Sequence, residues 1–545
     1  MAVSTSKRIT TALFRISRAV VFLPIVPLLL LGGCEVVNSR TGLQCQTTSD
    51  CRSRGAAFAQ TLCSAAGVCE TIDVPEAGVA STACQTAVDC SSRLGFPGRC
   101  ISANCVAAYN PGLCQPVGPI TDDKAAVFGV LLPTQGKAAE LTQAAQGEVQ
   151  EIVDDWNGAI GTSGAPKVAA VVCDESQLDL AIAALQPLHP VALVGPVTDG
   201  DLAKVLAQLA QSNIPIFAPL GDNPAFVEHP SASRQLWSCV PSFHQAVPAM
   251  VSAFGQLSQF VITARTLTKI KVALVHGTAS DEDALYREVE PLLSFNGDLA
   301  TNQVGTFYFP TSIDYDPNAT GVSTIAQAQQ VDISAPDLVV TLGLWWQGNL
   351  GLNIGNRWSA LNGAKPLPFY LNVYDSPEFT GDTSNDGRVF ALDVNLSGAL
   401  LQNDLAFRAR LSQDQLTEPF GGSHLSDCVY SAFYGAYAAS VAAGTSAASL
   451  DLSQFTQGMQ AVTSGSTQGN LTQADISKLF GLIENKVPVQ MVGAGAVLGF
   501  DPTTGVPSGG FALQCISAST SNGWTPAGLT FNATTGAADG TLACP

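Results

Sequence analysis

Four apolar runs lie between residues 126 and 219: AVFGVLLP (126–133), KVAAVVCDE (167–175), VALVGP (191–196) and IPIFAP (214–219). Continuous Val, Ile, Leu and Ala predict strands that are buried on both faces, because a strand with one wet face alternates apolar and polar residues. Stretches of helical length separate the runs, the first from about residue 138 to 156. The pattern therefore predicts a parallel sheet with right-handed helical crossovers.

The loops that follow these strands are the first place to look for a binding site. In open parallel sheets, ligands bind beyond the carboxyl ends of the strands. The corresponding loops here are 133–136, 195–201 and 219–223. Among their residues are Thr134, Gln135, Thr198, Asp199, Gly221 and Asp222.

The order of motifs resembles one family. LLPTQG, VVCDES, VALVGPVTDG and IPIFAPLGDNP are similar, in order and spacing, to the extracellular ligand-binding proteins of the leucine/isoleucine/valine-binding type. Beyond residue 225 the α/β pattern restarts, and the resemblance continues to residue 517. It implies a periplasmic-binding-protein type 1 fold, in which two lobes, each a parallel sheet flanked by helices, close on a ligand about a hinge. The later motifs are IKVALVHG (270–277), PDLVVTLG (336–343), HLSDCVYSAFYGAYAAS (424–440) and GAGAVLGFDPTTGVP (493–507).

The resemblance also implies candidates in the second lobe. Loops after two of its strands contact the ligand in the family, and here they carry Trp345, Trp346, Tyr374 and Asp375. Adjacent tryptophans in an extended segment point in opposite directions, so only one of the pair is expected to line the cleft. An aromatic ring there suits a sugar, a ring or a cation. The alternative is that both tryptophans are core residues.

Two aspartates depart from the family's pattern. In the family, small hydroxyl residues and backbone N–H groups after the third and fourth strands hold the α-carboxylate and α-amino groups of an amino acid. The resemblance makes the matching positions here, Thr198, Asp199, Gly221 and Asp222, candidates for ligand binding. Asp199 stands where the family typically has Ser, and Asp222 where it has Thr. Two carboxylates about 4 Å apart repel by roughly 4 kcal/mol at an effective dielectric near 20. If both aspartates face the cleft, a cationic, amine-bearing or neutral hydroxylated ligand fits better. The competing interpretation is that they cap the helices that follow.

Composition and motifs argue against several other functions. The formal net charge of −19 disfavours nucleic acid and anionic lipid surfaces as partners. The sequence has no P-loop, H-E-x-x-H or G-x-S-x-G motif, and its five histidines lack metal-ligand spacing. GAGAVLG (493–499) is interpreted as a glycine-punctuated strand and not as a dinucleotide fingerprint. We expect no enzyme activity, no cofactor and no metal.

The amino terminus resembles a bacterial lipoprotein signal. A basic segment precedes an apolar run of signal-peptide length (19–31), which ends in Leu31-Gly32-Gly33-Cys34. In the lipobox that this resembles, the Cys receives a diacylglycerol and becomes the first mature residue, so Cys34 is the predicted lipidation site. Glu35 is not the Asp associated with inner-membrane retention in enteric bacteria, which favours the outer membrane.

A duplicated cysteine pattern fills the segment between the signal and the α/β region. Residues 43–69 and 82–105 share C-Q-T-x-x-D-C-x-x-R followed by two further cysteines. Four cysteines per repeat in an exported chain indicate disulfides, and the spacing does not suit zinc. Each repeat allows three pairings. The six other cysteines, 114, 173, 239, 428, 515 and 544, allow three more bridges, and proximity favours Cys515 with Cys544.

The predicted organisation is a signal peptide (1–33), a Cys-rich duplicated stalk and linker (34–120), a two-lobed ligand-binding domain (121–517) and an irregular tail (518–545). The resemblance implies a lipid-anchored extracytoplasmic protein that captures a small polar solute, such as an amino acid or amine, for an ABC importer or a sensor. The alternative is a cell-envelope structural or interaction lipoprotein that keeps the fold without the small-molecule site.

Overall fold

The computed structural model of the chain describes most of the sequence. The chain divides into two compact units, residues 1–71 and 72–545. The predicted signal peptide, Cys34, Gln135, Asp222, Trp345, Tyr374 and Asp375 lie outside the described residues. The described residues are 61–63, 69–71, 83–134, 139, 145–161, 163–221, 223, 234–315, 323–343, 346–373, 377–380, 382–394, 399–410, 419–501, 504–507, 509–517 and 523–544.

The first lobe is built on a six-stranded sheet in the order β10-β9-β8-β6-β7-β5. Five strands are parallel and fully buried, which confirms the prediction from their uninterrupted apolar runs. The edge strand β5 pairs antiparallel with β7. The strands are β5 (Cys114–Val117), β6 (Ala126–Leu132), β7 (Val168–Asp174), β8 (Leu193–Val194), β9 (Ile216–Ala218) and β10 (Leu236–Ser238).

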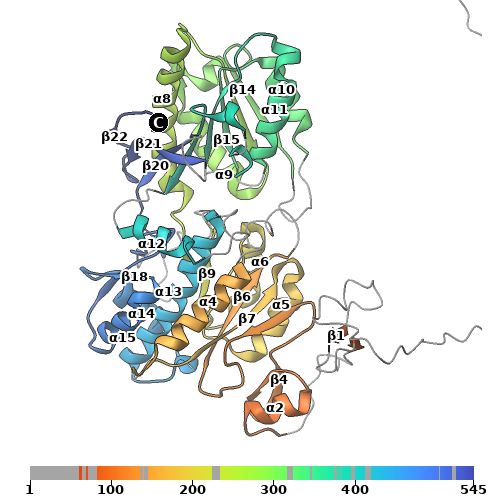
Figure 1. Ribbon diagram of the computed structural model, residues 1–545, viewed down its shortest axis with the longest axis vertical. Helices are drawn as coiled ribbons and strands as arrows, with labels where there is room; N and C mark the ends of the chain where they lie inside the picture. Colours follow the sequence, from red (N-terminus) through yellow and green to blue (C-terminus); the bar gives the residue numbers. More distant parts are fainter. Residues whose placement is uncertain are drawn as a thin grey trace, which may run out of the picture. The chain divides into compact units, whose positions relative to one another are not determined.

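Helices from both ends of the sequence cover this sheet. On one face α4 packs with α13, and its Trp156 lies edge-on to Tyr434 and Phe480. Figure 1 shows the late helices (blue) beside the early α4 (orange). Helices α5 and α6 cover the opposite face. The helices are α4 (Ala145–Ala159), α5 (Leu178–Leu185), α6 (Asp199–Leu209), α12 (Ala399–Arg408), α13 (Pro419–Ala443), α14 (Leu452–Thr463) and α15 (Ile476–Glu484). A short pair of parallel strands accompanies α14 and α15: β18 (Thr467–Asn470) and β19 (Val489–Val492).

The second lobe is built on an eight-stranded sheet in the order β14-β11-β15-β16-β17-β20-β21-β22. The first five strands are parallel, and the last three are antiparallel. The expected second parallel sheet is thus confirmed. The strands are β11 (Val272–Gly277), β14 (Tyr308–Ile313), β15 (Leu338–Leu342), β16 (Phe369–Val373), β17 (Val389–Val394), β20 (Phe511–Ile516), β21 (Trp524–Phe531) and β22 (Ala538–Gly540).

The expectation of an irregular tail is wrong. Strands β21 and β22 extend the second sheet, and a disulfide joins Cys515 on β20 to Cys544, as proximity suggested. The many Gly, Thr and Asn residues conceal an apolar alternation in β21, where Ala527, Leu529 and Phe531 are buried. The binding-fold sheet therefore continues beyond residue 517.

Two pairs of helices cover the second sheet. Helices α8 (Phe243–Arg265) and α9 (Ser280–Val289) lie against one face. Helices α10 (Ile325–Ser334) and α11 (Gln347–Asn362) lie against the other. Among the described helices, α8 alone is long and apolar enough to cross a membrane, but half of its apolar window is buried, with Phe254 and Leu257 in the core. It is therefore placed as a core helix of this lobe.

The second cysteine repeat forms a small module with its own helix, α2 (Ala87–Leu94), and a hairpin of β3 (Gly98–Ile101) and β4 (Asn104–Ala107). Its bridges are Cys84–Cys100 and Cys90–Cys105. Among the described residues, one group of side chains is close enough to hold a metal, Cys84, Cys90 and Cys105, but disulfides occupy all three thiols. In the first repeat, β1 (Thr61–Cys63) and β2 (Cys69–Thr71) pair in the same way, with Cys63 opposite Cys69.

The chain passes between the lobes three times, and neighbouring residues of α13 hold two of these crossings. The crossings join β10 to α8, β17 to α12, and β19 to β20. Cys428 forms a disulfide with Cys239, directly after β10. Asp427 accepts hydrogen bonds of 2.7–3.0 Å from the backbone N–H groups of residues 494–496. The GAGA segment is thus a loop around a buried carboxylate, and the strand that we expected there is not formed.

Three further features complete the fold. Cys114 on β5 is bridged to Cys173 on β7, which ties the Cys-rich region to the first lobe. A short hairpin, β12 (Ser294–Phe295) and β13 (Asp298–Leu299), follows α9. Single turns of 3-10 helix lie at Glu175–Gln177, Gln186–Leu188, Glu290–Leu292, Ala300–Gln303, Pro377–Phe379, Thr383–Asn385, Ala447–Ser449 and Gln473–Asp475.

Candidate functional site

Glu175 organises the carboxyl edge of the first sheet. It follows β7 directly and is only 1% exposed. Its Oε2 accepts a hydrogen bond from the backbone N–H of Val197 at 2.8 Å, and its Oε1 accepts one from Thr198 at 3.1 Å. Burial raises the pKa of Glu175 to about 8, whereas the two N–H donors lower it. Both oxygens of the Glu175 side chain therefore accept backbone N–H groups of the loop after β8.

Thr198 is the N-cap of helix α6. Its backbone is extended, and its hydroxyl accepts from the backbone N–H of Asp201 and donates to the Asp201 carboxylate at 3.2 Å. Asp199 is the first residue of the helix and is 7% exposed. The expectation that Asp199 caps α6 is therefore wrong, because Thr198 is the N-cap. A carboxylate in the first turn, such as that of Asp199, still interacts favourably with the helix dipole.

The structure brings together the described candidates of the first lobe. A Cβ on Gly221 would lie 3.8 Å from Oδ1 of Asp199, so the loops after β8 and β9 meet. The hydroxyl of Ser238, at the end of β10, donates to the Gly221 carbonyl at 2.6 Å. The backbone N–H of Thr134, after β6, donates to Asp174 at 3.3 Å. Hydrogen bonds and close contacts thus link the loops after adjacent parallel strands, as the sheet topology requires.

In the second lobe, Glu282 binds neighbouring strand-end loops, as Glu175 does in the first lobe. It lies in the first turn of α9 and is 5% exposed. Its Oε1 accepts from the Tyr315 hydroxyl at 2.6 Å, and its Oε2 accepts from Nε1 of Trp346 at 3.0 Å. Tyr315 follows β14, and Trp346 follows β15. Because these strands flank β11 in the sheet, one carboxylate ties together the loops of three neighbouring strands.

The close approach of Glu282 explains two glycines at these strand ends. A side chain on Gly277, the last residue of β11, or on Gly343, after β15, would collide with the Glu282 carboxylate. Because Gly277 and Gly343 have no side chains, the Glu282 carboxylate can pack directly against both strand ends.

Of the two adjacent tryptophans, Trp346 is a core residue. It is fully buried in the cluster beneath α11 and is oriented by Glu282. The expectation that the two tryptophans point in different directions stays a prediction. Trp345, the candidate for the cleft, lies outside the described residues, as do Tyr374 and Asp375. Asn372 lies on β16, two residues before Tyr374, and its Oδ1 accepts a hydrogen bond from the Thr341 hydroxyl on β15 at 2.6 Å.

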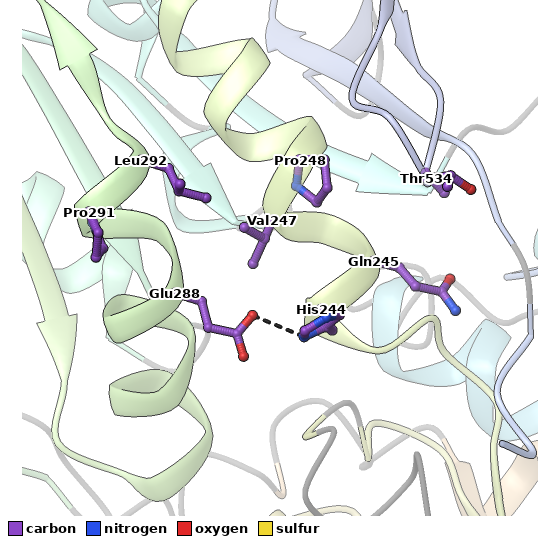
Figure 2. A pocket seen from close by; sticks show the side chains of 9 residues that line it. His244, Gln245, Val247, Pro248, Glu288, Pro291, Leu292 and Thr534 are labelled. Carbon is purple, nitrogen blue, oxygen red and sulfur yellow. Dashed lines mark ion pairs between the residues drawn. The ribbon is translucent and has the colours of Figure 1, made fainter. Parts of the chain in front are cut away.

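A separate groove of about 670 Å³ lies on the second lobe (Figure 2). Helix α8 supplies His244, Gln245, Val247 and Pro248, and the end of α9 and the turn after it supply Glu288, Pro291 and Leu292. Nδ1 of His244 lies 3.0 Å from the Glu288 carboxylate. The turn between β21 and β22 contributes Ala533 and Thr534. None of the residues that line this groove is a candidate of the strand-end loops.

The fold described above is that of the type 1 periplasmic binding proteins. One similar solved structure is the leucine-binding protein of Thermotoga maritima MSB8, with a TM-score of 0.50 and 13% identity over 75% of this chain and 99% of that chain. A type 1 periplasmic binding protein of Bordetella pertussis Tohama I gives 0.51 and 13% over 74% and 99%. An ABC-transporter solute-binding protein of Rhodopseudomonas palustris BisB5, in complex with 3,4-dihydroxybenzoic acid, gives 0.53 and 11% over 77% and 99%.

At these identities the likeness establishes the fold. No protein-family model matches the sequence, and no curated protein sequence matches it. Of these structures, one is a leucine-binding protein and one is a solute-binding protein of an ABC transporter.

Sequence reasoning missed the two glutamates that organise the strand ends. Glu175 was visible as the acid that ends a predicted strand, KVAAVVCDE (167–175). Glu282 carried no such signal, because it stands five residues beyond its strand, in the first turn of an ordinary amphipathic helix.

Proposed function

We propose that this chain is a lipid-anchored, extracytoplasmic solute-binding protein that captures a small polar ligand between its two lobes. The observation that carries the proposal is the convergence of polar loops at the strand ends of both lobes, around Glu175 in the first and Glu282 in the second. Ligands of parallel α/β sheets bind at this edge. The similar solved structures support a binding role.

The proposed mechanism is a population shift. A ligand that contacts both lobes only when they are closed favours the closed state by its differential affinity, and no covalent step is needed. The two buried clamps on α13, the Cys239–Cys428 disulfide and the Asp427 loop, fix the first-lobe ends of two crossings. Bending at those crossings would then move the lobes as units.

The residues proposed to contact the ligand come from the strand-end loops. In the first lobe they are Thr134, Gln135, Thr198, Asp199, Gly221 and Asp222. In the second lobe they are Trp345, Tyr374 and Asp375. The partner would be an ABC importer or a membrane sensor, and the anchor a diacylglycerol on Cys34.

A thermal-shift screen of the full chain tests the binding role. The panel contains amino acids, amines, sugars and small organic acids. A ligand at 100 times its Kd adds about 2.7 kcal/mol to the stability. We expect at least one solute to raise the Tm. If no solute does, the proposal fails, and the alternative of an envelope interaction protein with this fold becomes the better explanation.

The anchor needs its own test. We expect the intact mass of the membrane-extracted protein to show a diacylglycerol on Cys34, and Cys34→Ala to release the chain from the membrane fraction. A Cys34→Ala chain that stays membrane-bound would refute lipid attachment at this residue.

A further inference from the structure

We propose that the ligand of the strand-end site is an organic cation, an amine or a guanidine, that carries no carboxylate group. This inference rests on the proposed function, because it names the class of solute that the proposed site would take. It starts from the hydrogen-bond donors and acceptors that the described loops offer.

At the amino-terminal end of helix α6, three backbone N–H groups are already bound within the protein. Such a helix end binds phosphates and carboxylates through free N–H groups and the helix dipole. Here the N–H groups of Val197 and Thr198 donate to the protein's own Glu175, and that of Asp201 donates to the Thr198 hydroxyl. A ligand carboxylate would have to displace a buried internal one to use them.

The other strand ends show the same pattern. The N–H of Thr134 donates to Asp174, and the Tyr315 hydroxyl and the Trp346 indole both donate to Glu282. In each case an acidic side chain of the protein accepts the hydrogen bond. Among the described residues, these loops therefore favour a ligand that brings hydrogen-bond donors over one that brings acceptors.

The charge balance points the same way. Asp199 and Asp201 are both buried at the edge of the first sheet, and Nζ of Lys204 lies 2.7 Å from Asp201. A ligand carboxylate about 4 Å from one of these groups would lose roughly a thousandfold in affinity, and an ammonium group would gain in the same sense. The net charge of −19 also attracts cations to the protein.

Matched pairs of ligands test this inference on the full chain. Each pair consists of an amine and the amino acid from which it derives by loss of the carboxylate: isoamylamine and leucine, cadaverine and lysine, agmatine and arginine. We expect at least one amine to bind, by calorimetry and thermal shift, at least tenfold more tightly than its parent. Amino acids that bind as tightly as their amines would overturn the inference and leave the proposed function standing. If neither these pairs nor the wider panel of solutes bind, both fail.

A variant of Glu175 tests the physical cause. Glu175→Ala frees the N–H groups of Val197 and Thr198, so the parent amino acid should gain at least tenfold in affinity relative to its amine. His244→Ala, in the separate groove, is the matched control and should leave the ratio unchanged. An unchanged ratio in Glu175→Ala would overturn the role of the internal carboxylate. The comparison of pairs on the unmodified chain decides the ligand class even if the variant folds poorly.

Discussion

The carboxylate of Glu175 lies 2.8 Å from the backbone nitrogen of Val197, with both residues buried at the edge of the first sheet. Glu175 belongs to the loop after β7, and Val197 to the loop after β8. Since β6 stands between these strands in the sheet, the bond spans the end of β6. A residue of the chain thus stands where an anion would bind, and the loops are shaped around it.

Removal of this carboxylate should create a vacancy that a small anion can fill. Glu175→Ala leaves two buried N–H donors unsatisfied, and we expect a loss of about 2–4 kcal/mol of unfolding free energy. Formate should restore part of the lost Tm in this variant and leave the wild-type Tm unchanged. Glu484→Ala is the control, because Glu484 also accepts from two donors, Gly164 and Tyr437, but is exposed. Equal formate effects on both variants would contradict an anion-shaped vacancy.

Trp346 should contribute to stability through its bond to a charged acceptor. Trp346→Phe keeps most of the ring and removes the Nε1 donor to Glu282, at an expected cost of about 1–3 kcal/mol beyond the lost packing. The control is Trp358→Phe, because Nε1 of Trp358 donates to the neutral carbonyl of Lys365 at 2.7 Å. Urea unfolding of both variants gives the comparison. An equal or larger loss in Trp358→Phe would mean that the Glu282 bond adds nothing special.

The sequence predicted those features that depend on local pattern. Continuous apolar runs identified β6, β7 and β11, and the parallel topology followed from the helical stretches between them. The loops of the described first-lobe candidates Asp199 and Gly221 also met, because adjacent parallel strands end at the same edge. The tail strand β21 was missed because its buried residues alternate with Thr, Pro and Gly, which usually signal loops.

Features that depend on side chains from distant parts of the chain could not be predicted. Glu282 meets Tyr315 and Trp346 only because β14, β11 and β15 are neighbours in the sheet, an order that differs from their order in the sequence. The GAGA loop lost its expected strand for the same reason, since Asp427, 67 residues earlier than Ala494, accepts its N–H groups.

Glu148 should make the stability depend on pH. It is 2% exposed on α4, and burial, with a smaller contribution from Glu151, raises its pKa to about 8 from a model-peptide value of 4.5. Between these pH values the native state binds more protons at this site than the unfolded state. Its contribution to the unfolding free energy therefore falls as pH rises, by up to about 1.4 kcal/mol per pH unit.

The variant Glu148→Gln cannot lose this proton. We expect its unfolding free energy, from urea titrations at pH 5 and pH 8, to differ less between the two pH values than that of the wild type. Glu484→Gln is the control, because hydrogen bonds from Gly164 and Tyr437 lower the pKa of Glu484, and its contribution changes only below pH 4.5. A pH difference in Glu148→Gln as large as in the wild type would contradict the raised pKa.

The disulfides Cys239–Cys428 and Cys515–Cys544 should protect different parts of the chain. Cys239–Cys428 holds a crossing between the lobes against α13, and Cys515–Cys544 holds the tail strands against the second sheet. Loss of either bridge should cost about 2–5 kcal/mol, and the loss should be larger for the first bridge because it closes the longer loop. The two bridges span 189 and 29 residues, respectively.

Hydrogen exchange distinguishes the local effects of the two bridges. In the Cys239→Ala, Cys428→Ala double variant we expect faster exchange at residues 239–242 and 494–496, because α13 anchors both segments. In the Cys515→Ala, Cys544→Ala double variant the increase should be confined to β21 and β22. Each variant thus serves as the control for the other. If both variants exchanged faster over the same segments, global destabilisation would account for the data, and the assignment of Cys239–Cys428 as a clamp on the crossing would be wrong.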